Sequence, residues 1–104
     1  MTLLIGGGVV CVDTGVAVLL PSGRVVRGSR GGGCAHLLRD RLAVHVSRRG
    51  LDLYRVAGDR LEKLLSSTSS VDVAIAAAAA LGRGMGWALR LARRLEGLKT
   101  RFSR

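Results

Sequence analysis

The chain has 104 residues, of which 48% are hydrophobic, and it can therefore form one small domain that buries a limited fraction of its surface. Its 17 basic and 7 acidic residues give a net charge of +10, so a polyanion is the expected partner. The apolar N-terminal stretch contains several glycines and no preceding basic region, which argues against a signal peptide or membrane span and favours a cytoplasmic protein.

The positive charge is segregated along the chain. Nine basic and three acidic residues between 24 and 60 give +6, and seven basic residues with one acidic residue between 83 and 104 give another +6. Fifteen of the basic residues are Arg, whose guanidinium suits bidentate phosphate contacts, although a GC-rich genome also favours Arg codons. The chain contains no Asn and no Gln, which fits a hot habitat.

The N-terminal part predicts strands joined by tight turns. Residues 9–12 and 16–20 are aliphatic runs separated by Asp13-Thr14-Gly15, which predicts a hairpin. Pro21-Ser22-Gly23 predicts a turn into a third strand over residues 24–28. The glycine triplets at 6–8 and 31–33 frame this unit, either as flexible joints or as places of close backbone approach.

A second hairpin is predicted after a short helical stretch. Residues 34–41 suit one or two helical turns, and Leu42, Val44 and Val46 then alternate with other residues up to a corner at 47–50. The following strand brings Leu51 and Leu53 to the same aliphatic face. The other face would turn its side chains outward, namely Arg41, His45, Asp52 and Tyr54.

The C-terminal third predicts helices. Asp59 and Glu62 have the spacing of a capping box, which predicts a short helix over residues 60–65. A serine-rich linker then ends in Ser69, an N-cap with Asp72 three residues later. Gly82, Gly84 and Gly86 either break the following helix in two or permit a close contact. The apolar face keeps its phase through them, so we expect one helix to residue 104.

The sequence contains no motif that indicates catalysis, a cofactor or a metal. Gly6-Gly7-Gly8 lacks the spacing of a dinucleotide-binding loop. Cys34 and His36 cannot pair locally as a nucleophile and base, and neither cysteine has a set of partners at metal-ligand spacing. Cys11 and Cys34 would be buried thiols in a mesophilic cytosol, or a disulfide in a hyperthermophile. We therefore expect no enzyme, no cofactor and no metal.

Basic residues cluster on the turns and strand ends of the predicted sheet, with one aromatic side chain and one histidine among them. Such a surface can hold a single strand through phosphate contacts and base stacking, or it is simply a solvated positive surface. The candidate nucleic-acid-binding residues are Arg24, Arg27, Arg30, Arg39, Arg41, His45, Arg48, Arg49, Tyr54 and Arg55.

The C-terminal helix has two chemically distinct faces. At 100° per residue its basic face forms a second basic row, made by Arg83, Arg90, Arg94 and Arg101. The opposite apolar face is wide for so small a domain, and either self-association or the core of one chain would bury it. The candidate association residues are Leu81, Met85, Ala88, Leu89, Ala92 and Leu95.

A basic strand-rich module over residues 2–57 followed by an association helix over 69–102, in a chain without Asn or Gln, resembles the shorter relatives of ThermoDBP, the archaeal single-stranded-DNA-binding proteins. The resemblance implies that the sheet contacts a DNA strand and that the C-terminal helices join subunits. The residues implied in the DNA contact are Arg24, Arg27, Arg41, Tyr54 and Arg55.

Together these patterns predict an α+β fold with an antiparallel sheet of about five strands, short helices and a long C-terminal helix. Residues 1–68 would form the nucleic-acid-binding module and residues 69–104 the association helix of a single compact domain. The predicted function is single-stranded DNA binding without sequence preference, by a homo-oligomer such as a dimer or tetramer. The alternatives are a structural RNA-binding component of a ribonucleoprotein and a membrane-surface protein with a basic amphipathic helix, although no membrane contact is expected.

Overall fold

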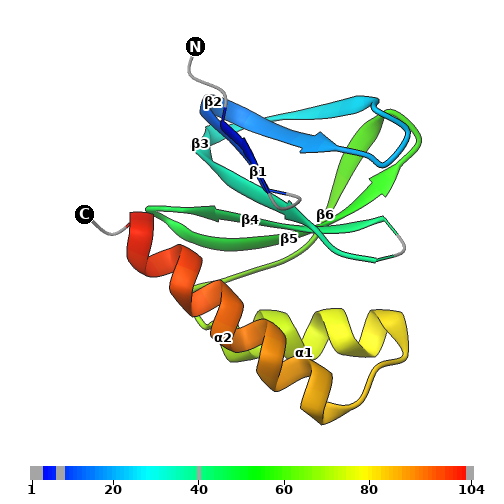
Figure 1. Ribbon diagram of the computed structural model, residues 1–104, viewed down its shortest axis with the longest axis vertical. Coiled ribbons are helices and arrows are strands. Elements are labelled where there is room, and N and C mark those ends of the chain that lie inside the picture. Colours follow the sequence, from blue (N-terminus) through cyan, green and yellow to red (C-terminus); the bar gives the residue numbers. More distant parts are fainter. Residues whose placement is uncertain (1–3, 7–8, 40, 103–104) are drawn as a thin grey trace.

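The computed structural model describes residues 4–6, 9–39 and 41–102, and within these it describes the side chains of residues 9–28, 32–39 and 41–100. The predicted α+β class is confirmed. Six strands form one antiparallel sheet in sequence order, one more than expected, and two helices follow (Figure 1). The elements are β1 (Leu4–Gly6), β2 (Val9–Leu19), β3 (Val25–Leu37), β4 (Leu42–Ser47), β5 (Gly50–Ala57), β6 (Arg60–Ser67), α1 (Ser70–Leu81) and α2 (Met85–Phe102).

The first predicted hairpin is wrong, because residues 9–19 form the single strand β2. Gly15 does adopt a left-handed conformation, with φ of 77°, but it lies at a bulge between Thr14 and Val16 where the pairing with β3 shifts. A Cβ at Gly15 would meet the Gly28 carbonyl oxygen at 2.9 Å. The bulge therefore lets one strand bend and continue where the local sequence suggested a turn.

Strand β3 is longer than predicted and includes two segments assigned otherwise from the sequence. Gly31 and Gly33 pair with β2, and a Cβ at Gly32 would collide with the Asp13 carbonyl. Of the two alternatives that the sequence left open for this triplet, close backbone approach is the one found. Residues 34–37, predicted to be helical, continue the strand between β2 and β4. Pairing on both sides supplies the backbone hydrogen bonds that a short isolated helix would otherwise make.

The predicted short helix over residues 60–65 is also wrong. These residues belong to β6, which pairs with β5 from Ala57↔Arg60 to Leu51↔Ser67. Gly58, with φ of 65°, makes the tight turn between the two strands. The Asp59 and Glu62 pattern fits a helix N-terminus locally, but eight residues of strand pairing with β5 outweigh one capping box.

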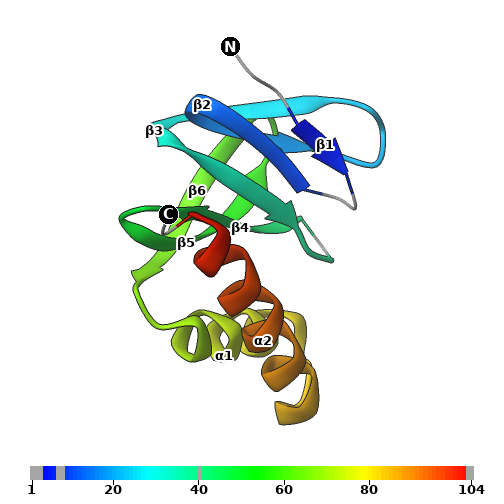
Figure 2. The ribbon, with the colours of Figure 1, turned by 60° about the vertical axis from the view of Figure 1, so that its left-hand side comes forward.

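The β2–β3 hairpin bends over the rest of the sheet, so that the sheet curls (Figures 1 and 2). The end of this hairpin reaches the β5–β6 turn, where the Arg24 guanidinium donates a hydrogen bond to the Gly58 carbonyl. The curl encloses an inner core built from small and β-branched side chains. Its buried members are Val16, Val18, Val26, Ala35, Ala43 and Val56.

The predicted second hairpin is confirmed as β4 and β5, with its corner at residues 47–50. Its aliphatic face is also confirmed, because Leu42, Val44, Val46, Leu51 and Leu53 are buried together. Helices α1 and α2 cover this face (Figure 1). The sheet and the helices therefore share one core, to which the helices contribute Val73, Ala74, Ala77, Ala78, Ala88, Leu91, Ala92 and Leu95.

The helix start is confirmed and the single long helix is wrong. Ser69 caps α1, with its Oγ accepting from the Asp72 backbone N–H at 3.3 Å. The helix ends at Gly82, which is left-handed with φ of 65°, and the Arg83 N–H then bonds to the Ala78 carbonyl at 2.8 Å. This is a glycine C-cap of the Schellman type. The glycine cluster thus breaks the helix in two, the alternative that the sequence left open.

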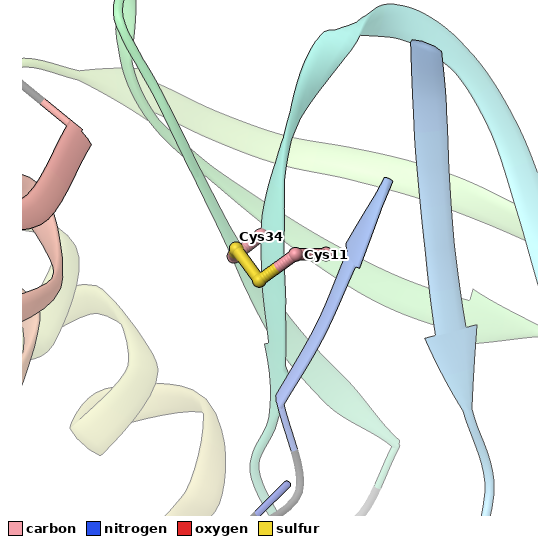
Figure 3. The surroundings of a disulfide bond; sticks show 2 residues. All are labelled: Cys11 and Cys34. Carbon is pink, nitrogen blue, oxygen red and sulfur yellow. A yellow bond between two sulfur atoms is a disulfide. The ribbon is translucent and has the colours of Figure 1, made fainter. Parts of the chain in front are cut away.

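Cys11 and Cys34 form a disulfide (Figure 3). They lie directly opposite each other in the β2–β3 ladder, and Cys34 is in turn opposite Val46 of β4. Opposed residues point to the same face of a sheet, so the bond lies on the face to which Val46 also belongs. Of the two alternatives that the sequence offered for these cysteines, the disulfide is therefore the one found.

Candidate nucleic-acid interface

Three connections of the sheet meet at one end of the molecule, on the right of Figure 1. They are the β2–β3 turn at 20–24, the β3–β4 connection, described at residues 38, 39 and 41, and the β5–β6 turn at 58–59. Arg24 ties the first to the third through the Gly58 carbonyl, and the Val56 N–H donates to the Arg41 carbonyl at 2.7 Å. This end of the sheet carries five exposed arginines, called here the arginine end: Arg24, Arg39, Arg41, Arg55 and Arg60.

Two described acidic residues lie among these arginines. Asp59 is in the β5–β6 turn, and Glu62 is directly opposite Arg55 in the β5–β6 ladder. The five arginines and two described carboxylates sum to +3, and Asp40, which stands between Arg39 and Arg41 in the sequence, lowers this sum to +2. Asp40 lies outside the described residues. An exposed concentration of guanidinium groups at strand ends can neutralise phosphates without reading a sequence.

Arg60 was missed by the sequence analysis. It was assigned to the predicted helix over 60–65 and therefore grouped apart from the basic turns. The β5–β6 pairing places it opposite Ala57, two residues from Gly58, the residue that Arg24 contacts. Gly58 could have indicated the position of Arg60, because a glycine there is typical of a tight turn between strands as well as of a linker.

A groove lies between the β2–β3 turn and the β3–β4 connection. It has a volume of about 680 Å³ and is lined by Leu20, Pro21, Ser22, Leu37, Leu38, Arg39 and Arg41. Pro21, Ser22 and the two arginines are exposed, whereas the three leucines are half-buried. In the described part of the chain no carboxylate forms an ion pair with Arg39 or Arg41.

Arg41 has an uncommon backbone conformation. Its φ is 64°, and among the described residues it is the non-glycine residue with positive φ. A side chain in this left-handed region meets a steric penalty that glycine avoids. Glycine occupies the left-handed positions at 15, 23, 58 and 82. Strained backbone positions cluster at functional sites, so the conformation of Arg41 makes it a candidate for a functional role.

The other predicted basic residues lie elsewhere. Arg48 and Arg49 are exposed in the β4–β5 turn, at the opposite end of that hairpin from Arg41 and Arg55. Arg27 is exposed on β3 and lies opposite Ala17. The side chain of Arg30 lies outside the described residues. The ten residues predicted from the sequence thus do not form one surface.

His45 and Tyr54 are not on the surface, which corrects the sequence analysis. They are 1% and 6% exposed, respectively, because the curl of the sheet covers the face that was expected to point outward. His45 Nδ1 lies 3.8 Å from Asp52 Oδ2, and the Ser66 hydroxyl donates to Asp52 Oδ1. Neither His45 nor Tyr54 can therefore reach a nucleic-acid strand, and the predicted stacking platform does not exist at Tyr54.

The second basic row is shorter than predicted. Arg90 and Arg94 lie on the exposed side of α2, together with Arg93, but Arg83 lies in the connection between the helices. The side chain of Arg101 lies outside the described residues. Arg94 also contacts His36 of β3, with its guanidinium Nη1 3.3 Å from His36 Nε2. Burial, and secondarily the Arg94 charge, lowers the pKa of His36 below its ordinary value of 6.5.

The predicted association face is mostly used inside the chain. Ala88, Ala92 and Leu95 are buried in the core between the helices and the sheet, and Leu81 packs against that core. Met85 and Leu89 are 60% and 52% exposed. The association set drawn from the sequence is therefore wrong for its three buried members, because helical phase cannot distinguish a core face from an interface.

The described ranges contain neither a metal-ligand cluster nor a helix that could span a membrane. Within residues 9–39 and 41–102, no three His, Cys, Asp or Glu side chains gather in a way that could hold a metal ion. Neither α1 nor α2, as far as the structure describes the chain, combines the length and apolar character that a membrane-spanning helix needs.

No protein-family model, curated protein or solved structure matches this chain. The resemblance to ThermoDBP proteins therefore stays a prediction, and the functional argument depends on the geometry of the arginine end.

Proposed function

We propose that this protein binds single-stranded nucleic acid, DNA in the first instance, through contacts between arginines and phosphates and without sequence preference. The observation that supports this proposal is the convergence of Arg24, Arg39, Arg41, Arg55 and Arg60 where three connections meet. Binding through contacts between arginines and phosphates would depend strongly on salt concentration.

The salt dependence of binding tests this proposal. Five phosphate contacts on a single strand predict a slope of about −3.5 in a plot of log affinity against log salt concentration. Affinity would then fall roughly 100-fold between 50 and 200 mM salt. A labelled strand of about 30 nucleotides exceeds the footprint of one small domain and suits fluorescence anisotropy. A flat salt dependence would refute phosphate binding.

Two charge-reversal variants, Arg39→Glu and Arg48→Glu, test whether nucleic acid binds at the arginine end. Arg39→Glu should weaken binding strongly, because it removes one guanidinium from the arginine end and adds a carboxylate. Arg48→Glu makes the same chemical change in the β4–β5 turn, at the opposite end of that hairpin. Equal losses from the two variants would contradict an interface at the arginine end and favour a diffuse attraction to the whole basic surface.

RNA remains the main alternative ligand. Phosphate contacts are common to DNA and RNA, and no exposed aromatic side chain in the described part of the chain separates the two. Competition between unlabelled single-stranded DNA and a folded RNA of equal length decides this point. Tighter binding of the folded RNA would favour the ribonucleoprotein alternative.

We also propose that the chain self-associates through apolar side chains left exposed on its helices. Val71 and Ile75 on α1, and Met85 and Leu89 on α2, are each spaced by four residues and lie on one side of their helix. Light scattering of the wild type and of a Met85→Asp, Leu89→Asp double variant tests this. A monomeric wild type would refute self-association. An oligomeric wild type whose double variant keeps the same oligomeric state would refute an interface at Met85 and Leu89.

A further inference from the structure

The groove beside the arginine end combines two kinds of surface. Leu20, Leu37 and Leu38 give it aliphatic walls and Pro21 adds a flat, rigid ring, whereas Arg39 and Arg41 place positive charge at its edge. A bare phosphate chain needs the arginines and has no use for the aliphatic walls. A nucleotide matches both, because its phosphate is anionic and the faces of its base are apolar.

We propose that this groove receives an unpaired nucleobase from the strand whose phosphates Arg39 and Arg41 bind. This inference rests on the proposed function and names the part of the ligand that the groove recognises. The volume of about 680 Å³ is within the range of pockets that hold small organic molecules. It exceeds what one base requires, so bases of different size can enter and no sequence preference follows.

The groove would also make the protein prefer single strands over duplexes, a preference that the buried Tyr54 cannot provide by base stacking. Tyr54 is buried and Trp87 is half-buried against the core between helices and sheet, so the described part of the chain offers no fully exposed aromatic ring on which bases could stack. A base in a duplex is paired and stacked on both faces, and entering a groove would require flipping it out of the helix. An unpaired base enters at little cost.

The experiment compares two labelled strands of equal length and phosphate number, one of DNA and one with abasic sugars throughout. Base entry predicts that the DNA binds about fivefold or more tightly than the abasic strand. The salt slopes of the two should be equal because their phosphates are equal in number.

Two variants of Ser22 place the base in the groove. Ser22 is exposed in the groove wall, and its hydroxyl accepts from the Arg24 N–H at 3.4 Å. Ser22→Leu fills space without changing charge, so it should reduce DNA binding to the level of the abasic strand and leave the abasic strand unaffected. Ser22→Ala removes the same hydroxyl without filling the groove and should preserve the difference between the strands.

The outcomes separate this inference from the proposed function. Equal affinity for DNA and the abasic strand, with a steep salt slope for both, would overturn base entry and leave phosphate binding intact. A difference between the strands that persists in Ser22→Leu would overturn the location in the groove. Absence of salt-dependent binding to either strand would overturn both proposals.

Discussion

Replacing Arg41 by glycine should stabilise the fold and weaken nucleic-acid binding at the same time. The residue has a φ of 64° and its carbonyl accepts from the Val56 N–H at 2.7 Å, so the hydrogen-bonded strand end holds it in the left-handed region. Its side chain is exposed at the edge of the groove. Glycine relieves the backbone strain and removes one guanidinium.

The expected magnitudes follow from these two changes. Removing the steric strain of the left-handed conformation should stabilise the fold by about 1–2 kcal/mol. The greater conformational freedom of glycine in the unfolded chain should destabilise the fold by about 0.4–1 kcal/mol. The middle values of these two ranges give a net gain of about 0.8 kcal/mol, which corresponds to a rise of about 3–6 °C in Tm for a domain of this size. Loss of one phosphate contact should lower the salt slope by about 0.7 and the affinity about fivefold at 0.1 M salt.

Thermal unfolding and anisotropy titrations on the same samples measure both effects. Arg41→Lys keeps the charge and the strained backbone, so it should leave Tm and the salt slope close to those of the wild type. Arg48→Gly makes the same substitution where φ is not positive, so it should lower Tm slightly and leave the salt slope unchanged. A lower Tm in Arg41→Gly would refute the strain argument, and an unchanged slope would remove Arg41 from the interface.

Three further predictions concern the disulfide, the buried tyrosine and a histidine. Reduction of Cys11–Cys34, which are 23 residues apart, should lower the free energy of unfolding by about 3 kcal/mol, and coincident urea curves with and without reductant would contradict this. Tyr54→Ala should lower the free energy of unfolding by about 3 kcal/mol, because it opens a cavity in the core. Tyr54→Phe should bind nucleic acid as the wild type does. Weaker binding by a stably folded Tyr54→Phe variant would show that Tyr54 belongs to the interface. The pKa of His36 is lowered in the folded state, so as pH falls the unfolded chain binds a proton before the folded chain does. The contribution of neutral His36 to the free energy of unfolding is therefore complete above pH 6.5 and is lost as pH falls toward the folded-state pKa. His36→Gln should flatten this part of a plot of stability against pH, and an unchanged plot would exclude His36 as the cause.

The elements predicted correctly are those whose local signals agree with their tertiary surroundings. The alternation of Leu42, Val44 and Val46 matches a strand with one face under the helices, and Ser69 caps α1 as its spacing to Asp72 predicts. The failures occur where local signals are ambiguous. Asp13-Thr14-Gly15 is compatible with a turn or a bulge, and the choice depends on β3, whose pairing partner for Thr14 is Gly31.

The sequence predicted the basic character of the candidate site but not which arginines gather there. Excess arginine on turns predicted a basic surface, and the arginines whose side chains the structure describes are indeed exposed. Which of them gather depends on contacts such as Arg24 with Gly58, which are 34 residues apart. His45 and Tyr54 were placed on the surface because an alternating strand shows two faces without showing whether the second face is covered.

The sequence by itself determined the net charge, the β4–β5 hairpin, the start of α1 and the glycines at which helix and strand geometry change. These features depend on residue type and on spacings of a few residues. Only the tertiary structure decided that the sheet curls, that the curl buries His45 and Tyr54, and that three connections bring five arginines to one end. The physical reason is that curling depends on the bend of the long β2–β3 hairpin and on the apolar area enclosed between segments far apart in the chain.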